Sequence, residues 1–177
     1  MTAPIKASKK VTLGRTTWWA IPSLSSQTSP PITDVNSASG LNITGFVLGE
    51  QEGFTSSTGK TALPRWLLET SVTETLEPTT FTIPTFRFGW DPQAAAGAND
   101  KKAWALFKDG FTGFLVRRQN VVNSVSDAAV AGEFLDSAAV IANVGVPMES
   151  GTGADAIYVF DVEFGMTGTP VFNKAAV

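Results

Sequence analysis

The 177-residue chain contains neither histidine nor cysteine. Histidine is the usual general base and metal ligand near neutral pH, and cysteine supplies thiolate nucleophiles and disulfide bonds. Only carboxylates, hydroxyls, lysine and arginine remain for chemistry. The composition therefore favours a structural protein over an enzyme, and we expect no catalytic centre, no cofactor and no metal site. The absence of cysteine also agrees with a reducing compartment.

Long apolar runs are absent as well. No stretch reaches the roughly 18 residues that a membrane-spanning helix needs, and residues 1–15 lack the apolar run of a secretory signal. We expect a soluble protein that is made in the cytoplasm and has no membrane partner. A length of 177 residues fits one domain, residues 1–177, which is long enough to bury its own core.

Charge is unevenly distributed along the chain. The first fifteen residues contain no acidic residue and four basic ones: Lys6, Lys9, Lys10 and Arg15. Removing these four from the 13 basic residues leaves nine against 16 acidic ones, so the remainder carries about −7. An acidic body argues against a surface that grips nucleic acid. The basic arm, residues 1–15, is expected either to contact phosphate or an acidic neighbour, or to be a solvated tail.

Strand-forming patterns dominate the chain. Hydrophobic residues make up 43% of it, with 12 Phe and 5 Trp, while 16 Gly and 10 Pro indicate many turns between short elements. Alternation and β-favouring residues predict strands at residues 11–21, 66–76, 112–119, 133–146 and 154–166. A further strand is expected from Phe81 to Trp90, with a kink near Pro84. One short helix is predicted at residues 101–108, capped by Asn99 or Asp100 and ended by Gly110.

The last of these strands shows the clearest alternation. One face is predicted to enter the core: Tyr158, Phe160, Val162, Phe164 and Met166. The other face consists of Ile157, Val159, Asp161 and Glu163. Trp18 and Trp19 are adjacent on a predicted strand, so they must point to opposite faces, and we expect one of them to be buried against a neighbouring subunit.

Two segments resemble catalytic or binding motifs without meeting their requirements. Residues 53–61 read Gly-Phe-Thr-Ser-Ser-Thr-Gly-Lys-Thr, which differs from a phosphate-binding P-loop because five residues, not four, separate the glycines. Pro64 also stands where the required helix begins. Asp161, Glu163 and Glu69 suggest a carboxylate pair for glycoside hydrolysis, but charged residues that alternate with apolar ones are equally typical of a solvated strand face.

From residue 66 to the end, the predicted elements are two strands, one short helix, a strand and a closing hairpin. The helix segment, residues 99–110, reads Asn-Asp-Lys-Lys-Ala-Trp-Ala-Leu-Phe-Lys-Asp-Gly, and the strand after it contains Phe-Leu-Val-Arg-Arg. Residues 157–170 read Ile-Tyr-Val-Phe-Asp-Val-Glu-Phe-Gly-Met-Thr-Gly-Thr-Pro. This order and this ending resemble the major tail tube proteins of long-tailed, siphophage-type bacteriophages.

The resemblance implies a mainly β fold: a β-sandwich or barrel-like tail tube domain with one short flanking helix and a long inter-strand loop at residues 41–64. It also implies a structural protein of the virion tail that forms homohexameric rings. The rings stack into a tube that conducts genome DNA during ejection. The expected partners are other copies of the chain, tape measure and tail terminator or tip proteins, and DNA that passes without specific binding.

Candidate site residues follow from this expectation. A conduit repels phosphate best with acids and small hydroxyls, so the lumen candidates are Glu69, Ser71, Thr73, Thr75, Asp161 and Glu163. The long loop is expected to reach an adjacent ring through an apolar patch formed by Phe46, Val47, Leu48 and Phe54. Contacts of the N-terminal arm with an acidic neighbouring subunit are expected from Lys6, Lys9, Lys10 and Arg15. Residues 23–40 look irregular, and no role is assigned to them.

Other interpretations remain open at this point. A capsid decoration protein or a carbohydrate-binding module shares this composition, and tryptophans serve the second as sugar-stacking platforms. Trp66, Trp90 and Trp104, however, fall in phase with apolar residues and are expected in the core. Rings give masses in multiples of six, whereas these alternatives give trimers or monomers. A carboxylate hydrolase needs a deep pocket and turnover on glycans.

Overall fold

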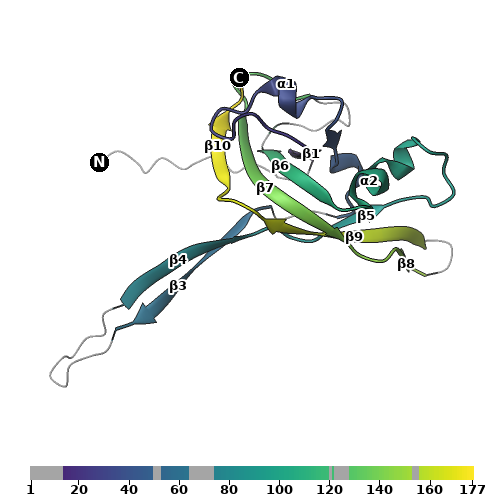
Figure 1. Cartoon of the computed structure of the whole chain (residues 1–177). Helices are drawn as coiled ribbons and strands as arrows, with labels where there is room; N and C mark the ends of the chain where they lie inside the picture. The colour runs from purple at the N-terminus through teal and green to yellow at the C-terminus, as the bar shows by residue number, and fades with distance from the viewer. Residues whose placement is uncertain (1–13, 50–52, 64–73, 120, 122–127, 153–155) are drawn as a thin grey trace, which may run out of the picture.

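The computed structural model describes residues 14–49, 53–63, 74–119, 121, 128–152 and 156–177 (Figure 1). The main sheet consists of β1 (Thr16–Ile21), β2 (Leu41–Asn42), β5 (Phe86–Gly89), β6 (Phe111–Gln119), β7 (Phe134–Val144), β8 (Met148–Ser150), β9 (Ile157–Met166) and β10 (Val171–Ala175). A separate two-stranded sheet consists of β3 (Thr55–Ala62) and β4 (Glu74–Thr82). The helices are α1 (Ile32–Val35), the 3-10 turn η1 (Thr44–Phe46) and α2 (Asn99–Phe107).

The main sheet curls so that its two ends approach each other. Its strands run in the order β2-β1-β6-β7-β9-β5 and pair antiparallel. The segment after β2 reaches β5, where Val47 forms a bridge with Phe88 and the amide of Leu48 donates to the carbonyl of Arg87 at 2.8 Å. The predicted mainly β, sandwich-like fold with a flanking helix is therefore confirmed.

Two hydrophobic clusters lie on opposite faces of β1, β6 and β7. The inner cluster includes Trp18, Phe86, Phe88, Phe107, Leu115, Val140, Phe160 and Val162. The outer cluster includes Trp19, Ile21, Leu24, Val35, Val116, Leu135 and Ala176. Trp18 and Trp19 are each 3% exposed, so their opposite orientation is confirmed. The expectation that one is buried against a neighbouring subunit is wrong, because Leu24, Val35 and Ala176 of the same chain cover Trp19.

Helix α2 packs its apolar face onto the inner cluster. Ala103 and Phe107 are buried there, and Gly110 follows with φ +84°, as the predicted left-handed end requires. The predicted cap is wrong, because Ala98 occupies the N-cap position without a side-chain hydrogen bond and both predicted capping residues lie inside the helix, which begins at Asn99. A helix this short is marginal in isolation. Burial of Phe107, rather than capping, therefore fixes it.

Strand β9 follows its predicted register over most of its length. The residues buried as expected are Phe160, Val162 and Phe164. Tyr158, in contrast, is 47% exposed, and Val159 is buried. The reason is that β9 begins as a hairpin with β8, where Val159 lies between Met148 and Gly89. Strand β9 is also not the final strand, because β10 follows it and pairs with β7.

Candidate assembly surfaces

Strands β3 and β4 form a hairpin that extends away from the body of the protein (Figure 1). Hydroxyl side chains bond across the two strands, with oxygen–oxygen distances of 2.6 Å for Thr55 and Thr82 and 2.7 Å for Thr58 and Thr79. Threonine favours strands because its β-branched side chain fits a pleated surface. The threonine-rich sequence thus explains why these residues form a two-stranded hairpin.

The hairpin has no hydrophobic core within its two described strands. The residues of β3 and β4 are exposed except Gly59 and Phe81, which are partly buried, and Leu76 is 73% exposed. An isolated two-stranded hairpin is marginally stable in water. Among the described strands, β3 and β4 pair only with each other, so their outer edges stay open to further pairing. The hairpin is therefore suited to contact with another molecule.

A bulge shapes the middle of the hairpin. The pairing register shifts between Thr58 and Lys60, and the Glu77 side chain lies over Gly59 and accepts a hydrogen bond from Thr61. A Cβ atom on Gly59 would lie 2.3 Å from the Glu77 carboxylate, so a larger residue displaces it. Because bulges increase the local twist of a strand, this arrangement helps to set the direction of the outer half.

Aromatic and charged residues fix the base of the hairpin, which we define as Trp18, Phe54, Phe81, Arg117 and Phe172. Phe54, directly before β3, lies 5.2 Å from Trp18 and 5.8 Å from Phe172 between ring centroids. Phe172 lies 5.9 Å from Phe81 of β4. The Arg117 guanidinium lies 5.5 Å from the Trp18 ring and 5.2 Å from the Phe54 ring. These contacts tie both hairpin strands to β1, β6 and β10.

A buried carboxylate holds Arg117 in place. The Nε and Nη2 atoms of Arg117 donate to Oδ2 of Asp136 at 3.0 and 2.7 Å. Oδ1 of Asp136 accepts from the amide of Asn173 at 2.9 Å. The two charged side chains are 9% and 11% exposed, so each depends on the other for compensation. Gly53 has φ +90°, and a Cβ atom there would lie 1.6 Å from Nη1 of Arg117. The approach to β3 therefore requires glycine.

The predicted ring-stacking residues lie on the body of the protein. Those that pack against the inner cluster are Phe46, Val47 and Phe54. Leu48 is 36% exposed. Residues 41–48 lie along the main sheet, whereas residues 55–62 extend as β3. The long loop expected at residues 41–64 is thus corrected. Most of its described large apolar residues join the core, Leu48 and Leu63 stay exposed, and its hydroxyl-rich half pairs with β4.

The predicted lumen residues that the structure describes lie in two different sheets. Those outside the described part of the chain are Glu69, Ser71 and Thr73. Thr75 lies on the hairpin, where its hydroxyl donates to the carbonyl of Thr61 at 3.3 Å. Asp161 and Glu163 share the less buried face of β9 in the main sheet. The structure therefore brings Asp161 and Glu163 together and places Thr75 in a different sheet.

A cross-strand arginine neutralises Asp161. Arg87 lies opposite it on β5 and donates from Nε and Nη2 at 2.8 and 2.9 Å. These hydrogen bonds lower the pKa of Asp161 from its ordinary value, and the same contact raises the pKa of Arg87. Glu163 is exposed opposite Asn143 of β7. Within the described residues Glu163 has no ion pair, so it supplies the uncompensated negative charge of this face.

The N-terminal arm is described only at its end. Its residues outside the described part are Lys6, Lys9 and Lys10. Arg15 is partly exposed immediately before β1. Contact of the arm with a neighbouring subunit stays a prediction.

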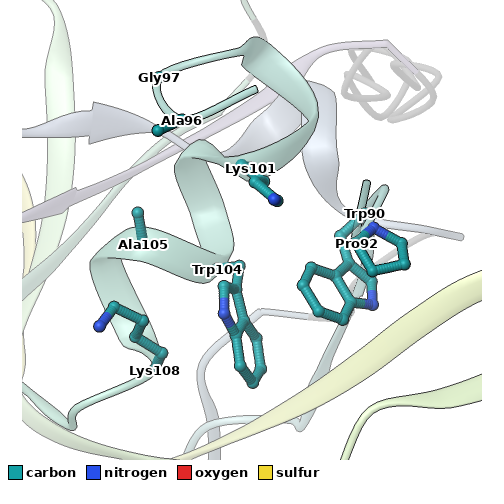
Figure 2. Close-up of a pocket in the computed structure, with 8 residues that line it drawn as sticks. All are labelled: Trp90, Pro92, Ala96, Gly97, Lys101, Trp104, Ala105 and Lys108. Carbon is teal, nitrogen blue, oxygen red and sulfur yellow. The ribbon is translucent and has the colours of Figure 1, made fainter. Parts of the chain in front are cut away.

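A cleft of about 370 Å³ lies between α2 and the segment after β5 (Figure 2). Trp90 and Trp104 stack in its wall with ring centroids 4.6 Å apart, and both pack against the inner cluster as predicted. Lys101 and Lys108 flank it, and Lys108 pairs with Asp109 at 2.7 Å. Its lining residues include no carboxylate and no hydroxyl. The cleft therefore lacks the carboxylate pair that glycoside hydrolysis uses.

No helix within the described residues is both long and apolar enough to span a membrane. In the same residues, no three acidic side chains come together as metal ligands.

Comparison with known proteins assigns the family. The family described as phage tail tube protein matches residues 3–177, which is nearly the whole chain. No curated protein matches it. A match of this extent gives the protein a structural role in the tail of the virion. The chain therefore belongs to the phage tail tube protein family.

Proposed function

We propose that six copies of the chain form a ring and that these rings stack into the tube of a long, siphophage-type tail. Genome DNA passes through the bore during ejection. The hairpin is the observation that carries this proposal, because its described strands β3 and β4 project from the body without a hydrophobic core between them. A part of this kind is stable when another copy covers it.

The hairpin takes the role that the sequence assigns to residues 41–64. In a stacked tube the body of a copy in the adjacent ring covers it, which gives the open strand edges and Leu76 a partner. Burying a leucine that is 73% exposed contributes about 1–2 kcal/mol. Each ring repeats that contribution in every copy, so a modest contact per subunit holds neighbouring rings together.

The hairpin base supports regular stacking. A tube requires every copy to present its hairpin at the same angle. That angle is fixed where the hairpin leaves the body by three aromatic side chains, Trp18, Phe54 and Phe172. The buried ion pair of Arg117 with Asp136 fixes it as well. We therefore assign the base a positioning role in assembly.

The face of β9 that carries Asp161 and Glu163 is our candidate for the wall of the bore. A conduit must not retain phosphate, and free lysine or arginine would bind it. On this face Arg87 is bound by Asp161, while Glu163 adds a negative charge. Replacing Glu163 with lysine should slow DNA exit while leaving the tubes intact. Glu163→Gln is the control, and unchanged ejection by the lysine variant would count against this assignment.

Other tail proteins complete the proposed tube. A tape measure protein occupies the bore before ejection, and terminator or tip proteins close the two ends. The acidic body of each copy, at about −7 over residues 16–177, suits contact with the basic arm of a neighbour. The arm residues in this contact are Lys6, Lys9, Lys10 and Arg15.

Shortening the hairpin tests the proposal. The variant joins Thr58 to Thr79 through an Asn-Gly turn and removes residues 59–78. It keeps the hydroxyl pair of Thr55 with Thr82 and the whole hairpin base. We expect a folded, soluble subunit that forms no rods in negative-stain micrographs, whereas the full chain forms hollow rods with an even axial repeat.

A matched control separates length from surface charge. Lys60→Gln breaks only the exposed ion pair with Glu74, 3.6 Å between Nζ and Oε2, which contributes little to stability. This variant should form normal tubes. Rods of normal length from the shortened hairpin would contradict the stacking role, and solution masses that are not multiples of six would contradict the ring.

A further inference from the structure

An exposed apolar surface surrounds β8. Its large side chains come from three adjoining segments: Val146, Met148, Ile157 and Tyr158. Val146 is 82% exposed, and the other three are nearly half exposed. Strand pairing gathers them along the edge formed by β8, but on two faces. Met148 and Ile157 share the face of Val159, because Met148 lies opposite Val159 and Ser150 lies opposite Ile157, whereas Tyr158 lies opposite Glu149 on the other face. Clustered apolar side chains of this kind mark an interaction site more often than scattered ones do.

A second exposed apolar surface surrounds the end of β10. Its large side chains are Val130, Phe134 and Val177, each more than half exposed. They are neighbours because Phe134 pairs with Ala175, and the amide of Gly132 donates to the carbonyl of Ala176 at 2.9 Å. We call these two regions the β8 surface and the β10 surface.

Each surface also adjoins an edge strand, although the edge just beyond β10 is covered by residues 30–32: the amide of Val177 donates to the carbonyl of Pro30 at 3.1 Å, and the amide of Ile32 donates to the carbonyl of Val177 at 2.8 Å. Among the described strands, β8 pairs only with β9 and β10 only with β7. Edge strands of this kind are ready to pair with another chain. Figure 1 shows β8 and β10 on opposite sides of the body. In a ring each copy must present two different surfaces, one to each neighbour, and two separate surfaces of this kind meet that requirement.

The charges on the two surfaces are opposite. Glu149 on β8 and Lys174 on β10 are both exposed, and neither has an ion-pair partner among the described residues. Elsewhere on the body many charged side chains are already matched within the chain, for example Arg87 with Asp161 and Lys108 with Asp109. An unmatched acid on one surface and an unmatched base on the other favour a second copy of this chain as the occupant.

We infer that the β8 surface of one copy packs against the β10 surface of the next copy around the ring, with Glu149 facing Lys174. This inference rests on the proposed ring and names the surfaces that close it. It is distinct from the hairpin contact, which joins one ring to another.

Charge reversal tests the inference. Glu149→Lys and Lys174→Glu each place like charges across the contact, and each should raise the critical concentration for assembly at least about tenfold. The double variant restores opposite charges and should assemble as the unmodified chain does. Light scattering and native mass spectrometry measure both properties. Circular dichroism should show all variants folded, because both side chains are exposed.

Mixing the two single variants gives a sharper test. Each is blocked against itself, but the β8 surface of the Glu149→Lys variant complements the β10 surface of the Lys174→Glu variant. An equal mixture should therefore form rings in which the two variants alternate, with three of each in a hexamer. Lys102→Glu reverses an exposed charge on α2, which belongs to neither surface, and should leave assembly unchanged.

The outcomes distinguish this inference from the proposed function. If the unmodified chain forms no ring, the proposed function and this inference fall together. If it forms rings and Glu149→Lys assembles equally well, only the inference is overturned. Failure of both the double variant and the mixture to assemble, with all variants folded, would also overturn it.

Discussion

Replacing Arg117 with leucine isolates the charge that holds the hairpin base. Leucine keeps an apolar contact with Trp18 and Phe54 but leaves Asp136, whose side chain is 11% exposed, without its cation. Removing one side of a buried ion pair costs about 3–5 kcal/mol. The lost contact of the guanidinium with two rings adds about 0.5–2 kcal/mol. Since a whole domain is stable by only about 5–15 kcal/mol, the free energy of unfolding should fall by a large fraction.

Urea denaturation of unassembled subunits, followed by tryptophan fluorescence, measures this loss. The matched variant combines Arg117→Leu with Asp136→Asn, which removes both charges and keeps a side-chain oxygen for the Asn173 amide. The double variant should be more stable than the single variant, because no uncompensated charge remains buried. A single variant that loses less than about 1 kcal/mol, as an exposed ion pair would, refutes the reasoning. A double variant less stable than the single one refutes it as well.

Two further pairs of substitutions test the glycine approach and the cross-strand ion pair. Gly53→Ala should destabilise the subunit by about 1–3 kcal/mol more than Gly97→Ala. Both glycines have positive φ, +90° and +85°, but only a Cβ atom at residue 53 meets the Arg117 side chain. Equal melting temperatures of the two variants would show that the Arg117 side chain moves aside freely. Asp161→Asn should make the free energy of unfolding depend less on pH in acid. The lowered pKa of Asp161 stabilises the folded chain at pH values above the ordinary pKa of 3.8, and this stabilisation is lost as the pH falls below that value. Glu163→Gln is the control in thermal unfolding from about pH 6 to about pH 2.5, and matching curves for Asp161→Asn and the unmodified chain would contradict the assignment.

Local patterns predict the elements whose partners lie within the chain. Alternation identifies the buried face of β9 at Phe160, Val162 and Phe164, because the main sheet covers that face along most of the strand. The break expected near Pro84 separates β4 from β5. The apolar face of α2 packs as predicted, whereas its cap does not, because a 3.6-residue period reports packing more directly than it reports where a helix begins.

The patterns do not predict the hairpin base, although the sequence carries one signal for it. Arg117 and Arg118 are adjacent at the end of an apolar strand, so they point to opposite faces, and both are buried. Buried arginines require carboxylates. Asp136 and Glu133 supply them at 2.7 and 3.1 Å, from the beginning of β7 and the residue before it. Two adjacent arginines in an apolar strand thus indicate that both faces of the strand are covered.

The hairpin shows how an apolar pattern misplaces a strand in a protein that assembles. Residues 66–76 alternate as a half-buried strand does, and Leu76, the described apolar residue of that pattern, is nevertheless 73% exposed on β4. The remainder of the pattern lies largely outside the described residues. Apolar and polar residues alternate along a strand wherever one of its faces is buried, whether that face packs against the same chain or against another copy. A strand whose sequence indicates a buried face, and whose structure leaves that face exposed, therefore points to a contact between molecules, and the side of the hairpin that carries Leu76 is the surface we expect the adjacent ring to cover.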